Sequence, residues 1–154
     1  MTSAAVYGTG SWGTAYASVL ADAGTSVTMW GRRQEVVDQI NAGTNEDYLP
    51  ELRLPGTIRA TTDPFEAAAG ADTVVLAVPS QTLRANLEVW GSALPSSAAI
   101  VSLLEGVELG TTRRMSEVIS EVGGVEPERV VIVSGPNLAR ELAGAGRIAF
   151  VPTM

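Results

Sequence analysis

The sequence predicts an α/β domain built on a doubly wound, mainly parallel sheet, and three observations carry this prediction. Short apolar runs rich in β-branched residues recur along the chain, and helical patterns lie between most of them. Most runs are continuous rather than alternating, as expected where helices cover both faces of a sheet. The repeated order of strand, helix and strand implies right-handed crossovers. A chain of 154 residues suffices for one domain. We therefore expect residues 1–154 to form a single Rossmann-like domain.

Seven apolar runs are predicted to be strands. They are AAVY (4–7), SVTMW (26–30), TIRAT (57–61), DTVVLAV (72–78), AAIVSLL (98–104), RVVIVS (129–134) and RIAFV (147–151). The longest irregular stretch is NAGTNEDYLPELRLPG (41–56). Because long loops inside compact domains are usually functional, we interpret this stretch as a functional loop or lid.

Four helices are predicted from apolar residues that recur at helical spacing. Their apolar faces are Trp12, Ala15, Tyr16, Val19, Leu20 and Ala23; Val36, Val37 and Ile40; Leu83, Leu87 and Trp90; and Met115, Val118, Ile119 and Val122. Ser80 is expected to cap the third helix, because a serine hydroxyl can accept from an amide of the first turn. Glycines are expected to end the other helices, at Gly24, Gly43 and the pair Gly123 and Gly124.

A glycine-rich turn lies between the first predicted strand and the first predicted helix. In YGTGSWGTA (7–15), Gly8, Gly10 and Gly13 have the spacing of a dinucleotide-binding turn. Gly8 would allow the tight turn, Gly10 would let a pyrophosphate approach the backbone, and Gly13 would let helix and strand pack closely. The amides of Ser11 and Trp12, at the helix N-terminus, are the expected phosphate donors. The alternative interpretation is a purely structural turn.

The second predicted strand ends in Trp30-Gly31-Arg32-Arg33, where NAD-binding domains usually carry an acid. A carboxylate would repel the 2′-phosphate of NADP, whereas guanidinium groups can grip it and stack on adenine. Arg32 and Arg33 therefore indicate that the cofactor is NADP or NAD. The alternative is that both arginines are solvated residues at the start of a helix.

Composition argues against several classes of function. The chain has no cysteine, histidine or lysine, so it offers no disulfide, no thiolate and no histidine base or metal ligand. Its formal net charge is -7, which argues against nucleic acid or an anionic membrane as a partner. No apolar run approaches the ~18 residues of a membrane span, and MTSAAVYG shows no signal peptide. We expect a cytoplasmic protein without a metal site.

Further motifs extend the pattern: YLP (48–50), AVPS (77–80), EGVELGT (105–111) and SGPNLA (134–139). With GTGSWGTA (8–15), WGRR (30–33) and LPGTIRATTD (54–63), they closely resemble the NAD(P)-dependent glycerol-3-phosphate dehydrogenases of bacteria, in their N-terminal cofactor-binding domain. The resemblance runs from Met1 to about Arg140. It implies hydride exchange between NAD(P)H and dihydroxyacetone phosphate, giving sn-glycerol 3-phosphate for phospholipid synthesis.

The resemblance also implies roles for individual residues. It implies cofactor contacts at Ser11, Trp12, Arg32, Arg33, Tyr48, Pro79 and Ala139, and substrate contacts at Gly135 and Asn137. The turns that carry these residues are predicted to lie at the carboxyl ends of strands or near them, where open α/β sheets bind ligands. For Tyr48 and Pro79, simple packing is the alternative role.

Two departures from the family's pattern limit the functional prediction. Glu105 stands where the family normally has a lysine that touches substrate and cofactor, so the charge there is reversed. The chain ends at Met154, whereas the family continues into a helical substrate domain that supplies the lysine proton acceptor. We therefore assign no catalytic residue. We expect a chain that is not catalytically complete alone and that self-associates or binds a helical partner domain.

Two other functions remain open from the sequence. The chain could be a non-catalytic NAD(P)-binding module that senses the cofactor or docks to a partner. It could also be a small reductase acting on another substrate, with Glu105 as acid or base.

Overall fold

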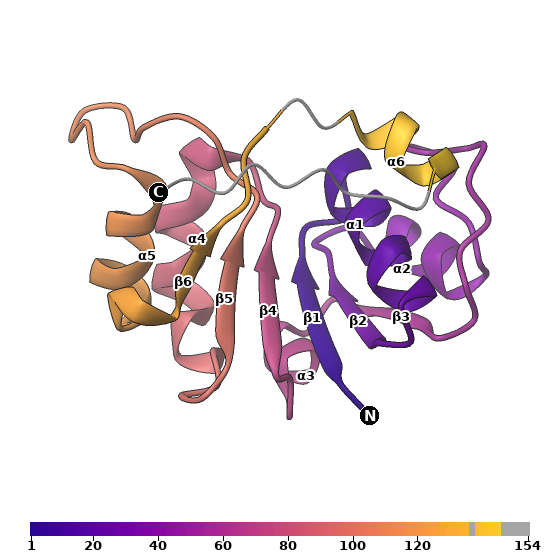
Figure 1. The fold of residues 1–154 in the computed structure, drawn as a ribbon, viewed down its shortest axis with the longest axis horizontal. Helices are drawn as coiled ribbons and strands as arrows, with labels where there is room; N and C mark the ends of the chain where they lie inside the picture. The colour runs from indigo at the N-terminus through magenta and orange to yellow at the C-terminus, as the bar shows by residue number, and fades with distance from the viewer. Residues whose placement is uncertain (136–137, 146–154) are drawn as a thin grey trace.

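A parallel sheet organises the chain in the computed structural model, which describes residues 1–135 and 138–145 (Figure 1). Within these residues the sheet has six strands in the order β3-β2-β1-β4-β5-β6. The strands are β1 (Ser3–Tyr7), β2 (Ser26–Trp30), β3 (Ile58–Thr61), β4 (Thr73–Leu76), β5 (Ala99–Ser102) and β6 (Val130–Ile132). The strand order reverses between β1 and β4, and α/β sheets bind ligands outside the carboxyl ends of the strands at such a point.

Six α-helices connect or follow these strands in the described residues. They are α1 (Ser11–Asp22), α2 (Gln34–Asn41), α3 (Pro64–Ala68), α4 (Leu83–Trp90), α5 (Met115–Gly123) and α6 (Ala139–Ala145). Short 3-10 turns η1 (Ser80–Thr82), η2 (Gly91–Ala93) and η3 (Pro127–Arg129) lie between them. Helices α1 and α2 cover one face of the sheet, and α3, α4 and α5 cover the other. Helix α6 packs against α1.

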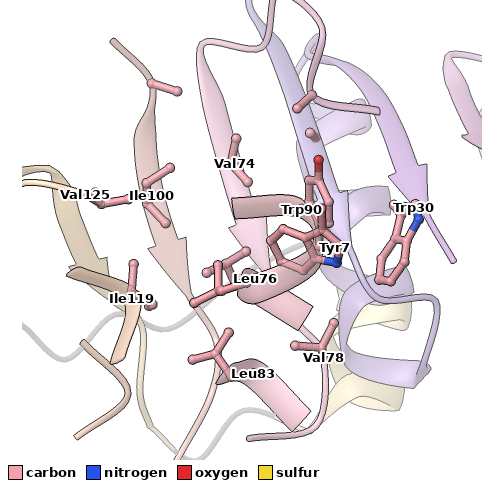
Figure 2. Packing of buried hydrophobic residues seen from close by; sticks show 14 of the residues in the cluster. Tyr7, Trp30, Val74, Leu76, Val78, Leu83, Trp90, Ile100, Ile119 and Val125 are labelled. Carbon is pink, nitrogen blue, oxygen red and sulfur yellow. The ribbon is translucent and has the colours of Figure 1, made fainter. Parts of the chain in front are cut away.

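The core has two halves because neighbouring side chains of each strand point to opposite faces of the sheet. In β4, Val74 and Leu76 pack with α4 and α5, whereas Val75 packs on the α1 side. On the α4 face, Tyr7 lies against Trp90 with ring centroids 4.3 Å apart, and Trp30 completes the aromatic cluster (Figure 2). Burial on both faces explains why the strand sequences are continuous apolar runs.

The predicted fold class is confirmed, and the first six predicted strands each contain an observed strand. The seventh, 147–151, lies outside the described residues. The prediction that Ser80 caps a helix is wrong, because Ser80 begins η1 after Pro79 and its side chain makes no capping bond. Helix α4 instead begins at Leu83. Helix α3 was not predicted, although Asp63 caps it and Pro64 opens it.

Candidate functional site

The glycine turn between β1 and α1 leaves room for a ligand at one position and none at the other two. Gly8 has a positive φ of 123°, and a Cβ there would lie 2.5 Å from the carbonyl oxygen of Ala77. A Cβ on Gly13 would collide with the Gly8 carbonyl, so this glycine lets α1 approach β1. A Cβ on Gly10 would meet nothing within 4 Å. The turn therefore exposes its backbone at Gly10, where a phosphate would have to approach.

Helix α1 begins directly after Gly10, and no side chain of the described residues caps its N-terminus. The first amides of a helix have no partner inside the helix, and the helix dipole places partial positive charge beside them. The first turn of α1 therefore offers N–H donors to an anion.

A hollow of about 360 Å³ opens at this turn, and we call it the glycine-turn hollow. It is lined by Gly8, Thr9, Gly10, Ser11, Trp12, Trp30, Gly31, Arg32, Arg33, Tyr48, Ala77, Val78, Pro79, Thr82 and Asn86. The structure thus brings together eight residues that the sequence predicts as cofactor contacts: Gly8, Gly10, Ser11, Trp12, Arg32, Arg33, Tyr48 and Pro79. They come from the segments after β1, β2 and β4 and from the loop after α2.

The two arginines of this hollow differ in what they contact. Arg33 Nη2 lies 2.9 Å from Asp47 Oδ2, and Arg33 Nε lies 4.0 Å from Glu35 Oε2. A side-chain hydrogen bond with Tyr48, and then the Asp47 carboxylate, raise the pKa of Arg33 above its ordinary value. Within residues 1–135 and 138–145, Arg32 makes no ion pair. Arg32 is therefore the arginine whose guanidinium is available to an incoming anion.

The loop after α2 reaches back to the glycine turn through Asn45. The Asn45 residue is fully buried, and its Nδ2 donates to the Thr9 carbonyl at 3.0 Å and to Thr14 Oγ1 at 2.9 Å. Ser11 Oγ also donates to the Tyr48 carbonyl at 3.1 Å. The sequence predicted a functional loop here but not these contacts. They tie the loop to the turn that faces the hollow.

A second hollow of about 460 Å³ adjoins the first, sharing Trp12, Ala77 and Val78 with it, and we call it the Glu105 hollow. Its other lining residues are Ser80, Leu103, Leu104, Glu105, Val133, Ser134, Gly135 and Leu138. Glu105 is exposed and accepts a long hydrogen bond of 3.4 Å from Ser134 Oγ. Among the described residues that line this hollow, Glu105 is the single ionisable side chain. This hollow is therefore negative where the family resemblance leads one to expect a positive charge.

The segment that carries Glu105 is fastened to α4 and the turn before it. Gln81 donates from Nε2 to the Val107 carbonyl at 2.9 Å, and its Oε1 accepts from the Leu109 amide at 2.9 Å. Arg84 grips Glu108 with two hydrogen bonds, of 2.8 and 2.9 Å. This contact, followed by one from Thr111, lowers the pKa of Glu108 to about 2. This clamp fixes the loop after β5, and it was not predicted from the sequence.

Three further predicted site residues lie outside the glycine-turn hollow, and a fourth is not described. Gly13 is buried behind the glycine turn. Ala139 opens α6 and is not among the lining residues of either hollow. Gly135 lines the Glu105 hollow, whereas Asn137 falls outside the described residues.

Two kinds of feature are absent from the described part of the chain. No group of three or more histidine, cysteine, aspartate or glutamate side chains in that part of the chain could hold a metal ion. No helix there is long and apolar enough to cross a membrane.

Comparison with known proteins gave consistent matches. The family model described as "NAD-dependent glycerol-3-phosphate dehydrogenase N-terminus" matches residues 3–151. A glycerol-3-phosphate dehydrogenase [NAD(P)+] of Streptomyces griseus is 60% identical over 141 residues, which cover 91% of this chain and 42% of that protein. A second such protein, from Mycobacterium tuberculosis, is 59% identical over 140 residues, covering 90% of this chain and 42% of its own length. The chain thus spans less than half the length of the curated relatives it matches.

Solved structures agree with these matches. The crystal structure of glycerol-3-phosphate dehydrogenase from Coxiella burnetii superposes with a TM-score of 0.83 at 32% identity, covering 93% of this chain and 43% of that one. The yeast glycerol-3-phosphate dehydrogenase structure superposes with a TM-score of 0.81 at 27% identity, covering 94% of this chain and 44% of that one.

Proposed function

The chain belongs to the family of NAD-dependent glycerol-3-phosphate dehydrogenase N-terminal domains, and from this premise we propose that its glycine-turn hollow binds NADP or NAD. The observation that carries the proposal is the joining of an open glycine turn and an arginine pair in one hollow. The space at Gly10 and the uncapped start of α1 suit a pyrophosphate. Arg32 and Arg33 suit the 2′-phosphate of NADP. Trp12, Tyr48 and Pro79 would complete the walls.

The proposed role in the whole enzyme is to supply the cofactor side of a hydride-transfer site. The bound nicotinamide would supply or accept the hydride, with dihydroxyacetone phosphate and sn-glycerol 3-phosphate as the other pair of reactants, for phospholipid synthesis. In this proposal residues 1–154 form one cofactor domain, Ala139 adds a cofactor contact, and Gly135 and Asn137 face the substrate. The cytoplasmic location and the association with itself or a helical partner domain stay predictions.

Glu105 is the observation that favours a second candidate, a binding module without this enzymatic activity. Among the described residues that line its hollow, no cation balances its charge. A carboxylate about 4 Å from a phosphate would repel it by about 4 kcal/mol at an effective dielectric of 20. A phosphorylated substrate would therefore meet repulsion at this position.

Titration with NADPH and NADH tests the proposal. Trp12 and Trp30 line the glycine-turn hollow, so their fluorescence should be quenched when a nucleotide binds. The double substitution Arg32→Ala and Arg33→Ala should weaken NADPH binding by about tenfold or more, because hydrogen bonds to a charged group are worth about 1.5–3 kcal/mol each. NADH should lose much less affinity. An unchanged NADPH affinity would contradict the assigned phosphate role.

A further inference from the structure

Asp47 lies beside the arginine pair on a segment that is held at the glycine-turn hollow. Asn45, two residues earlier, bonds to Thr9 and Thr14, and the carbonyl of the next residue, Tyr48, accepts from Ser11. The segment is therefore tied to the glycine-turn region on both sides of Asp47, through the Asn45 side chain and the Tyr48 carbonyl.

The Asp47 carboxylate is held by two partners. Gln39 Nε2 donates to Asp47 Oδ1 at 3.1 Å, and Gln39 Oε1 accepts from the Asp47 amide at 3.4 Å. The other carboxylate oxygen, Oδ2, lies 2.9 Å from Arg33 Nη2. Gln39 therefore helps to hold the Asp47 carboxylate beside Arg33, so its position does not depend on the ion pair alone.

The carboxylate has a consequence for any phosphate that Arg33 would bind. Two anions on one guanidinium share its positive charge and repel each other. Arg33 therefore carries less net attraction for a second anion than Arg32, which makes no ion pair in the described part of the chain. A 2′-hydroxyl has no charge and pays no such penalty.

We propose that Asp47 is a specificity-determining residue, acting through Arg33, that reduces the preference of this site for NADP over NAD. The inference rests on the proposed function, in which Arg33 faces the 2′-phosphate. In this arrangement Arg32 provides most of the attraction for the 2′-phosphate. Asp47 partly compensates the positive charge of Arg33, so both cofactors remain acceptable.

The substitution Asp47→Asn tests this inference because it keeps the shape and removes the charge. The amide oxygen that it introduces can still accept from Gln39, so the loop should keep its place. The gain in NADPH affinity should be about fivefold, the upper range for breaking an exposed ion pair, while NADH affinity should stay within about twofold. Glu46→Gln is the matched control: it removes the same charge from an exposed neighbour that makes no ion pair in the described residues. It should leave the ratio of the two affinities unchanged.

The outcomes separate the inference from the proposed function. A gain for NADPH alone, absent when Arg33→Ala is added to Asp47→Asn, supports the role of Asp47. Equal gains for both nucleotides, or the same gain in Glu46→Gln, would show a general charge effect and overturn it. A selective loss of NADPH affinity would also overturn it, because Asp47 would then be positioning Arg33 for the phosphate. Binding of neither nucleotide by the unsubstituted chain would overturn the proposed function first.

Discussion

Removing the side chain of Asn45 should damage both the stability of the fold and its grip on a dinucleotide. The amide of Asn45 donates two hydrogen bonds to the glycine-turn segment, at 3.0 and 2.9 Å, from a fully buried position. In Asn45→Ala the Thr9 carbonyl and the buried Thr14 hydroxyl lose this donor. Water cannot readily replace it in a closed site, so the turn should loosen.

The expected magnitude follows from these contacts. A buried polar group left without its partner costs about 1–3 kcal/mol. The substitution also removes Asn45 Oδ1, which is buried and has no hydrogen-bond partner among the described residues, so part of the cost is offset. A net loss of about 2 kcal/mol is expected, and for a chain of this size it should lower the melting temperature by about 4–8 °C.

The binding effect should be equal for NADPH and NADH, because the glycine turn would contact the pyrophosphate that both share. We expect a loss of about tenfold for each, measured by fluorescence titration below the melting transition. Asn41→Ala is the control: Asn41 also makes two hydrogen bonds, with the backbone of Ala60 at 2.8 and 3.0 Å, but it is exposed and lines neither hollow. Asn41→Ala should lower the stability of the fold and leave the affinity for both cofactors unchanged. Unchanged affinity in Asn45→Ala, or equal losses in both variants, would refute the reasoning.

Two further predictions concern the loop after β5. Glu105→Lys should tighten the binding of both NADPH and NADH, with a smaller gain for Glu105→Gln, because the negative charge disfavours phosphate-bearing ligands. Calorimetry at low salt would measure these affinities, and weaker binding in Glu105→Lys would contradict the repulsion assigned to Glu105. Arg84→Met should raise the pKa of Glu108 from about 2 toward its ordinary 4.5. The stabilisation from Glu108 is complete above pH 4.5 and is lost as the pH falls toward 2. The unsubstituted chain should therefore lose stability over this range, and Arg84→Met should lose less. Urea titrations from pH 2 to 6 would show the difference.

The glycine turn and the arginine pair could be predicted from the sequence because their chemistry is local. Gly8 occupies a turn whose positive φ favours glycine, so the residue itself indicates the turn. The start of a helix after Gly10 can be recognised from the residues that follow. The continuous apolar strands likewise carry their own evidence, since burial on both faces depends on the residues of the strand itself. These features do not need knowledge of a distant partner.

The contacts of Asn45 and Asp47 could not be predicted in the same way. Asn45 meets Thr9 and Thr14 across 36 and 31 residues, and the stretch between α2 and β3 has no periodic pattern that fixes its path. The predicted capping role of Ser80 was wrong for a related reason. A serine before an apolar helix suggests a cap, but a 3-10 turn after Pro79 separates Ser80 from the helix. Helix α3 had a local signal in Asp63 and Pro64, yet it is too short to show a helical period.

The two carboxylates at the hollows should act on different parts of a bound dinucleotide, and this makes their effects separable. Asp47 lies at the arginine pair, where NADP and NAD differ by the 2′-phosphate. Glu105 lines the adjoining hollow, which shares Trp12, Ala77 and Val78 with the glycine-turn hollow. Any part of a dinucleotide that reaches this hollow would be the same in the two cofactors. A change at Asp47 should therefore alter the ratio of the two affinities, whereas a change at Glu105 should alter both affinities and leave their ratio constant. If Glu105→Lys changed the ratio instead, the charge at position 105 would act on the 2′-phosphate, and the two carboxylates would not act on different parts of the dinucleotide.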